Sequence, residues 1–182
     1  MTYGELLSRL AEAATGSRRI AVDGPDAAGK TTLADALAAL LGATRVCADD
    51  HLRPRRDRHA QGSESPEGYY RDSFDDRALR AAIEAARAPV VVDGVFLQRA
   101  ELEDLWDFRI WVDVSPDETL RRASVRDAKR FTDVRGRYER RYLPAQRLYL
   151  DERDPRGRAD VVVENGDPAR PTLRRADGVA GK

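Results

Sequence analysis

One short segment has the residue types and spacing of a phosphate-binding loop. Residues 24–31 fit the pattern G-x-x-x-x-G-K-[ST]. Glycines at both ends allow a tight turn that aims backbone N–H groups at phosphate oxygens, and a helix N-terminus adds its positive dipole end. Lys30 would place a charge at the β- and γ-phosphates, and the Thr31 hydroxyl would complete a magnesium shell. The segment predicts binding of ATP with Mg²⁺. The expected nucleotide contacts are Gly24, Pro25, Asp26, Ala27, Ala28, Gly29, Lys30, Thr31 and Thr32.

Two acids could complete the chemistry. Asp49 closes a second predicted strand and Asp93 closes a third. In an open parallel sheet the carboxyl ends of the strands line the ligand crevice, so both acids should lie near the phosphates. One would act on an acceptor hydroxyl, and the other would hold magnesium directly or through water. The alternative for each is an aspartate that only caps a turn at a strand end.

A third element is basic. Arg122 and Arg126 are one helical turn apart and share a face, with Arg121 beside them. Guanidinium groups around a transferring phosphoryl group would stabilise its developing charge. The alternative is a solvated face that pairs with Asp117, Glu118 and Asp127.

Strands and helices alternate along the chain, which predicts how these groups are positioned. Apolar spacing predicts helices over 3–14, 33–41, 75–87, 116–129 and 135–150, and strands over 18–23, 44–48, 89–94, 108–114 and 160–164. The fold class is therefore α/β: a three-layer P-loop NTPase fold with a parallel sheet of about five strands and helices on both faces. Residues 1–182 would form one domain, with a long loop over 52–72 and a flexible tail over 171–182.

Composition narrows the function. Lys+Arg and Asp+Glu are both 32, and this balance argues against a nucleic-acid binder. No apolar run reaches the roughly 20 residues of a membrane helix, and the acidic N-terminal residues do not form a signal peptide. We expect a cytoplasmic protein with no membrane or nucleic-acid partner, and a homo-oligomer is one of the states that the sequence allows. The single cysteine, Cys47, is expected to be a buried residue rather than a nucleophile.

Taken together, these motifs resemble the uridine kinase and phosphoribulokinase group of P-loop kinases over residues 18–171. The matching segments are 24–32, 49–53, 93–94, 121–127 and 160–168. The resemblance implies Asp49 as the base for a nucleoside 5′-hydroxyl, although Asp50 remains an alternative. It implies Thr31 and Asp93 as magnesium ligands, Lys30, Arg122 and Arg126 as catalytic groups, and Arg121 as a third lid residue. Asn165 and Asp167, within 165–168, would border the adenine.

The acceptor is less well defined by the sequence. His51-Leu52 stands where the family usually has Phe-Tyr, and an acid for ribose hydroxyls has no clear match within residues 63–75. A small acceptor such as uridine or cytidine is the first hypothesis. An anionic acceptor (a nucleoside monophosphate, sugar phosphate or pantothenate-like alcohol) is the second, and a regulatory P-loop ATPase is the third. Five arginines favour an anion: Arg53, Arg55, Arg56, Arg58 and Arg71. Tyr69, Tyr70 and Phe74 either stack a base or pack on the sheet.

Overall fold

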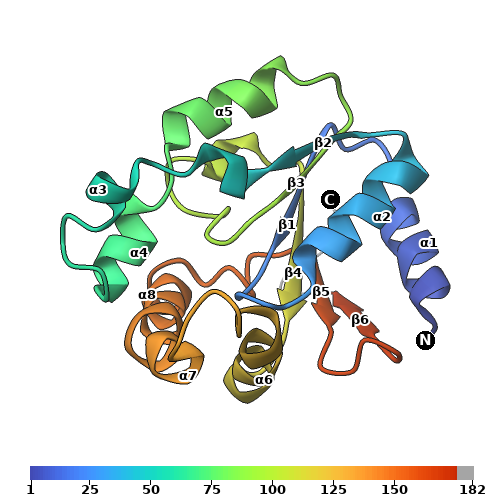
Figure 1. Ribbon diagram of the computed structural model, residues 1–182. Helices are drawn as coiled ribbons and strands as arrows, with labels where there is room; N and C mark the ends of the chain where they lie inside the picture. Colours follow the sequence, from blue (N-terminus) through green and yellow to red (C-terminus); the bar gives the residue numbers. More distant parts are fainter. Residues whose placement is uncertain (176–182) are drawn as a thin grey trace.

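The computed structural model describes residues 1–175, which fold around a six-stranded sheet (Figure 1). The strand order is β2-β3-β1-β4-β5-β6. The strands are β1 (Arg19–Asp23), β2 (Thr44–Cys47), β3 (Val90–Asp93), β4 (Phe108–Asp113), β5 (Val161–Glu164) and β6 (Thr172–Arg175). The first five run parallel, whereas β6 pairs antiparallel with β5. The α/β fold with about five parallel strands is confirmed, with one further strand at the edge.

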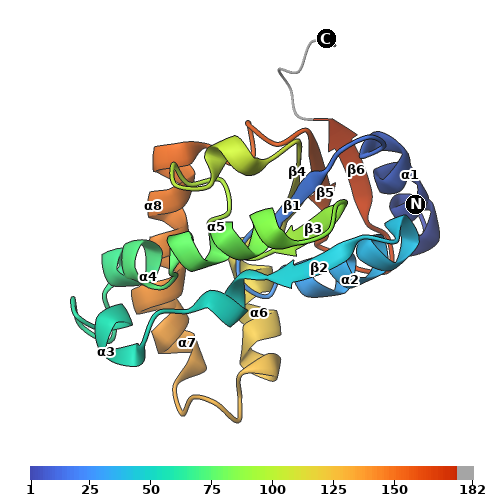
Figure 2. The same cartoon turned by 90° about the horizontal axis from the view of Figure 1, so that it is seen from above.

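Helices cover both faces of the sheet (Figure 2). On one face α1 (Tyr3–Ala13) and α2 (Lys30–Leu41) pack against Ile20 and Val22. On the other, α4 (Pro66–Asp72), α5 (Asp76–Ala85) and α8 (Leu143–Arg153) pack with Ala21, Val90 and Val92. Successive strand residues point to opposite faces, so both faces are buried and the strands read as continuous apolar runs.

A third, smaller cluster supports the segment beyond β4. Helix α6 (Pro116–Arg126) begins at Ser115, whose hydroxyl caps the Glu118 N–H, with proline at the first helical position. It packs through Leu120 and Ala123 against α7 (Val134–Arg137) and the π-helical segment Tyr138–Tyr142. These elements stand beside the carboxyl ends of the strands (Figure 1).

Three segments differ from the sequence-based expectation. The loop expected over 52–72 contains α3 (Arg55–Arg58) and α4, and the helix expected over 135–150 is divided into α7, the π-helical segment and α8. The tail expected from residue 171 is wrong for 172–175, because Glu164 and Thr172 pair β5 with β6. Residues 176–182 of that expected tail lie outside the described residues. The described helices include none that is long and apolar enough to cross a membrane.

Candidate active site

The phosphate-binding loop joins β1 to α2 and needs glycine at both ends. Gly24 has a φ of 151°, and a Cβ there would lie 2.4 Å from the carbonyl oxygen of Val112 in β4. Gly29 has a φ of 94°, and a Cβ there would lie 2.9 Å from the side-chain nitrogen of Asn165. Both positions combine backbone angles that favour glycine with close neighbours. The loop is thus held tightly between β4 and the end of β5.

Lys30 is buried at the start of α2. Its ammonium group donates to the Pro25 carbonyl at 2.6 Å, so the lysine spans its own loop. Burial lowers the pKa of Lys30, while the charges of Asp26 and Asp23 oppose that shift. The ammonium group therefore lies among carboxylates at the phosphate-binding loop and bonds to a backbone carbonyl of that loop.

Thr31 and Asp93, the two expected magnesium ligands, lie together. The Thr31 hydroxyl donates to Asp93 Oδ2 at 2.6 Å. Arg45 from β2, which the sequence analysis missed, places a guanidinium nitrogen 2.8 Å from Asp93 Oδ1. A hydroxyl and a carboxylate are the hard oxygen donors that Mg²⁺ prefers. Within residues 1–175 no three His, Cys, Asp or Glu side chains form a metal cluster.

Asp49 lies at the solvent-exposed rim of the site, in the 3₁₀ turn Ala48–His51 that follows β2. Partial desolvation and the charge of Asp26 raise the pKa of its carboxyl, while Lys30 and Arg126 act in the opposite direction. The carboxylate therefore shares its electrostatic surroundings with the lysine and with α6.

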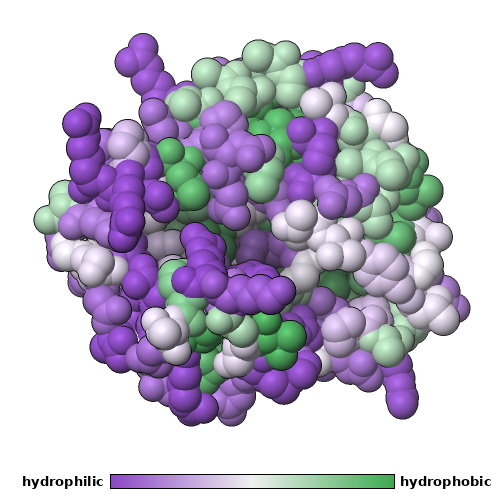
Figure 3. All heavy atoms as spheres, viewed as in Figure 1, coloured by the Kyte–Doolittle hydropathy of each residue, from purple (hydrophilic) through white to green (hydrophobic). Residues whose placement is uncertain are grey.

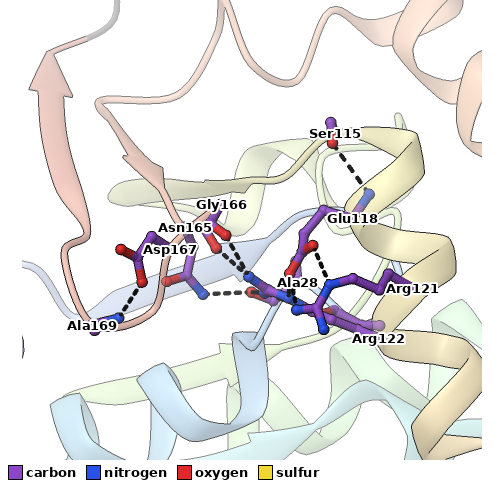
Figure 4. A network of polar contacts seen from close by, with 10 residues as sticks. Ala28, Ser115, Glu118, Arg121, Arg122, Asn165, Gly166, Asp167 and Ala169 are labelled. Atoms are coloured by element: carbon purple, nitrogen blue, oxygen red, sulfur yellow. Dashed lines mark hydrogen bonds and ion pairs between the residues drawn. The ribbon is translucent and has the colours of Figure 1, made fainter.

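Arg122 clamps the phosphate-binding loop to the segment after β5 (Figure 4). Its guanidinium donates to Ala28 at 3.3 Å and to the carbonyls of Asn165 and Gly166, and Glu118 pairs with its Nε at 2.6 Å. The Asn165 amide also donates to the Ala28 carbonyl, at 2.7 Å. This connection links α6, the loop and β5 into one unit.

The other two lid arginines are also engaged within the protein. Arg121 has a side chain that is 68% exposed and pairs with Glu118. Arg126 donates to both oxygens of Asp127, at 3.0 and 2.9 Å, and to the Tyr138 hydroxyl at 2.8 Å. Arg122 and Arg126, but not Arg121, line a hollow of about 250 Å³ over residues 27–32. Hydrophilic side chains surround a central hollow on this face (Figure 3).

A second hollow, of about 390 Å³, lies on the other side of Gly29. Apolar side chains form much of its wall, including Tyr3, Leu6, Leu33 and Val112, and Arg121, Asn165 and Pro168 also line it. Asp167 is not among the lining residues; its carboxylate accepts the Ala169 N–H in a turn. The expected adenine border thus lies beside a pocket of suitable character, with Asp167 shaping the loop that follows β5.

Sequence reasoning missed a connection from Asp26 to two helices. The Tyr69 hydroxyl of α4 donates to Asp26 at 3.1 Å, and the Gln146 amide of α8 donates at 2.8 Å. Asp26 occupies a variable position of the motif, so spacing alone gives no sign of these partners. The connection joins the phosphate-binding loop to the side of the site where Asp49 lies.

A buried acid at the end of β1 also supports the phosphate-binding loop. Asp23 is fully buried, accepts the Gly24 N–H at 2.8 Å and accepts the Tyr149 hydroxyl. Burial raises the pKa of Asp23, and the bond from Tyr149 partly offsets this shift. The same Tyr149 oxygen accepts the Gln98 N–H at 2.8 Å. This chain of hydrogen bonds fixes the first residue of the loop.

The expected aromatic base stack is largely a packing cluster. Tyr70 and Phe74 are buried in the core, so they do not offer free faces to a base. Tyr69 is half-buried. The centre of its ring lies 5.4 Å from the ring centre of Phe96 and 4.6 Å from that of Tyr142. Packing, rather than base stacking, accounts for these side chains.

Comparison with known proteins agrees with this geometry. A family model described as an AAA domain matches residues 20–142, which run from β1 to the end of the π-helical segment. The chain belongs to this family. It is also 26% identical to the uridine kinase of Chlamydia pneumoniae, over 79% of this chain and 80% of that protein.

Solved structures show the same fold. A candidate uridine kinase from Bacillus stearothermophilus has a TM-score of 0.65 at 23% identity, covering 87% of this chain and 97% of its own. A candidate fructose transport system kinase from Silicibacter sp. TM1040 has a TM-score of 0.66 at 20% identity, covering 84% and 96%. These structural matches confirm the predicted three-layer P-loop fold.

Proposed function

We propose that this chain is a kinase that transfers the γ-phosphoryl group of ATP to the hydroxyl of a small acceptor. The observation that carries the proposal is the convergence of Lys30, the Thr31–Asp93 pair and Asp49 at the carboxyl ends of three neighbouring strands. Phosphoryl transfer requires positioning and electrostatic stabilisation more than covalent chemistry, and this arrangement offers both. The 26% identity to a uridine kinase supports the same reaction class.

In the proposed reaction, the phosphates of ATP lie over residues 24–31. Lys30 leaves its bond to Pro25 and contacts the β- and γ-phosphates. Magnesium, held through Thr31 and Asp93 with phosphate oxygens, would neutralise part of the charge on the transferring group. The adenine takes the apolar hollow beside Asn165 and Pro168.

Asp49 then acts on the acceptor. The acceptor oxygen forms a bond to the γ-phosphorus as the bond to the bridging β–γ oxygen breaks, and its electron pair leaves with ADP. The acceptor proton passes to the Asp49 carboxylate. A carboxylate with a raised pKa is a better base near neutral pH than an ordinary aspartate. The charges of Lys30 and Arg126 act on Asp49, which supports a role for this carboxylate at the phosphate end of the acceptor.

The lid arginines would serve the transition state after rearrangement. Arg122 and Arg126 line the hollow over the loop, but both are engaged by protein partners in this structure. Arg126 is the better placed for the acceptor side, because its charge acts on Asp49. Arg122 would support the nucleotide side through its contacts with Ala28 and Asn165.

The test is ATP turnover with a panel of small alcohols, followed as ADP release and as acceptor mass. The panel contains uridine, cytidine, their monophosphates, sugar phosphates and pantothenate. We expect magnesium-dependent transfer to at least one acceptor, abolished in Lys30→Met. ADP release that is equal with and without every acceptor, with no phosphorylated product, would favour the regulatory ATPase instead.

A further inference from the structure

A buried arginine without a carboxylate partner lies beside the acceptor side of the site. Arg141, in the π-helical segment, is 3% exposed. Its Nη1 donates to the Ser63 carbonyl at 2.6 Å, while its Nε is enclosed and has no hydrogen-bond partner. Among residues 1–175 no carboxylate lies within 4.0 Å of its guanidinium nitrogens. Burying an unpaired charge is costly, so this arrangement invites a negatively charged ligand.

Two further arginines lie close enough for their charges to act on Arg141. The Nε of Arg58, at the end of α3, is likewise enclosed and unpartnered. Arg137 has a distant carboxylate, Glu64 at 3.8 Å, and Glu64 contacts Arg140 more closely. Burial of Arg141 lowers the pKa of its guanidinium, and the charges of Arg137 and Arg58 lower it further. The local charge is therefore positive and incompletely compensated.

A single aromatic ring connects this cluster to the phosphate-binding loop. The Arg141 guanidinium carbon lies 5.3 Å from the centre of the Tyr69 ring. The hydroxyl of the same ring donates to Asp26, within residues 24–31. A molecule whose hydroxyl reached the γ-phosphate near Asp26 and Asp49 could extend about one ring length toward Arg141. An acceptor of sugar or nucleotide size spans such a distance.

We propose that Arg58 and Arg141, with Arg137 beside them, bind an anionic group of the phosphoryl acceptor. The acceptor is then an alcohol that also bears a phosphate or a carboxylate, rather than a neutral nucleoside. This inference rests on the proposed function. Guanidinium groups bind both anions through paired hydrogen bonds, so the chemistry on the protein side is the same for either. A purely structural role for Arg141 would use its bond to Ser63, but it leaves the enclosed Arg58 unexplained.

The first test measures inorganic phosphate binding by calorimetry and thermal unfolding. A non-hydrolysable ATP analogue with Mg²⁺ is present at saturation, so the phosphate-binding loop is filled. We expect Arg58→Gln and Arg141→Gln each to weaken phosphate binding about 10-fold or more. The control is Arg147→Gln on α8, whose side chain is 76% exposed and which should change nothing. Arg58→Gln keeps the test decisive if the more buried Arg141 variant fails to fold.

Phosphate binding that is absent in the parent, or unchanged in a folded Arg58→Gln variant, would overturn the proposal. The second test compares ribose, ribose 5-phosphate and ribonate, together with uridine and its monophosphate, as acceptors. Turnover confined to phosphorylated or to carboxylated alcohols identifies the anion. Efficient turnover of neutral uridine, unaffected by Arg58→Gln, would overturn the inference and leave the kinase intact. Arg58-dependent phosphate binding without turnover of any alcohol would instead count against the kinase proposal.

Discussion

Arg45 places its guanidinium 2.8 Å from Asp93, a carboxylate that is only 2% exposed. The two residues come from neighbouring strands, β2 and β3, and the second oxygen of Asp93 accepts the Thr31 hydroxyl. The carboxylate is therefore oriented on both sides before any magnesium ion arrives. Its charge is partly neutralised by the arginine, which suits an acid that orients a metal shell.

Loss of Arg45 should leave a buried carboxylate uncompensated. We expect Arg45→Met to lower the free energy of unfolding by about 3 kcal/mol and to raise the magnesium concentration needed for half-maximal activity. Urea unfolding and a magnesium titration measure the two effects. The control is Asp35→Asn, which removes the other, 64% exposed partner of Arg45 and should cost less than about 1 kcal/mol. Equal effects of the two substitutions would contradict the orienting role.

Replacement of Lys30 should separate folding from catalysis. We expect Lys30→Met to remain folded, because methionine suits the buried part of the site, while phosphoryl transfer falls by at least about 100-fold. Circular dichroism and ADP release report the two properties. Lys129→Met, at an exposed position after α6, is the matched control. Activity near that of the parent in a folded Lys30 variant would rule out phosphate contact by this lysine.

The pH dependence of turnover should identify the base. Asp49 has a folded-state pKa above its ordinary value of 3.8, so its carboxylate becomes protonated at a higher pH than a free aspartate. We expect turnover to fall as the pH decreases through this raised pKa. Asp49→Asn should lower turnover strongly, and the remaining turnover should lack this acidic limb while ATP still binds. Asp50→Asn serves as the comparison, and loss of the limb there instead would reassign the base.

Tyr149→Phe tests the hydrogen bond from the Tyr149 hydroxyl to the buried Asp23, the residue directly before the phosphate-binding loop. Its hydroxyl lowers the pKa of Asp23, so its removal should raise that pKa further and cost about 1–3 kcal/mol of unfolding free energy near neutral pH. A raised carboxyl pKa means that the folded state binds the proton more tightly than the unfolded chain. Protonation of Asp23 should therefore stabilise the folded variant more than the parent, and the loss of unfolding free energy in Tyr149→Phe should shrink as the pH falls.

Urea unfolding of Tyr149→Phe at several pH values between about 4 and 8 measures this dependence. Tyr70→Phe is the control, because its hydroxyl donates to the half-exposed Glu152 rather than to a fully buried acid. Equal losses of unfolding free energy for the two variants at every pH would show that Tyr149 does not affect the pKa of Asp23.

The sequence was most informative where periodicity and strand ends define the structure. Val90, Val91 and Val92 predicted a strand buried on both faces, and the position of Asp93 at the end of that strand predicted a carboxylate near the phosphate-binding loop, where it accepts the Thr31 hydroxyl. Local patterns suffice there, because the geometry of a parallel sheet brings strand ends together.

Elsewhere the structure depends on partners distant in the sequence. Helices α3 and α4 are short and charged, and α4 depends on packing of Tyr70 against Phe96 and Tyr149. Strand β6 is polar and lies at a sheet edge, so it shows no alternating pattern that distinguishes it from a loop. The partners of Asp26 lie 43 and 120 residues away, beyond the reach of motif spacing.

The close approach of Gly24 to Val112 also limits how this protein can diverge. Gly16, Gly42 and Gly62 likewise have positive φ angles, but nothing lies within 4 Å of a Cβ placed there. Asparagine or aspartate could arise at those three positions at modest cost, since both tolerate left-handed backbone. At position 24 any side chain would collide with the backbone of β4, which has no rotamer to change. Proteins that descend from this sequence should therefore vary at Gly16, Gly42 and Gly62 and retain Gly24.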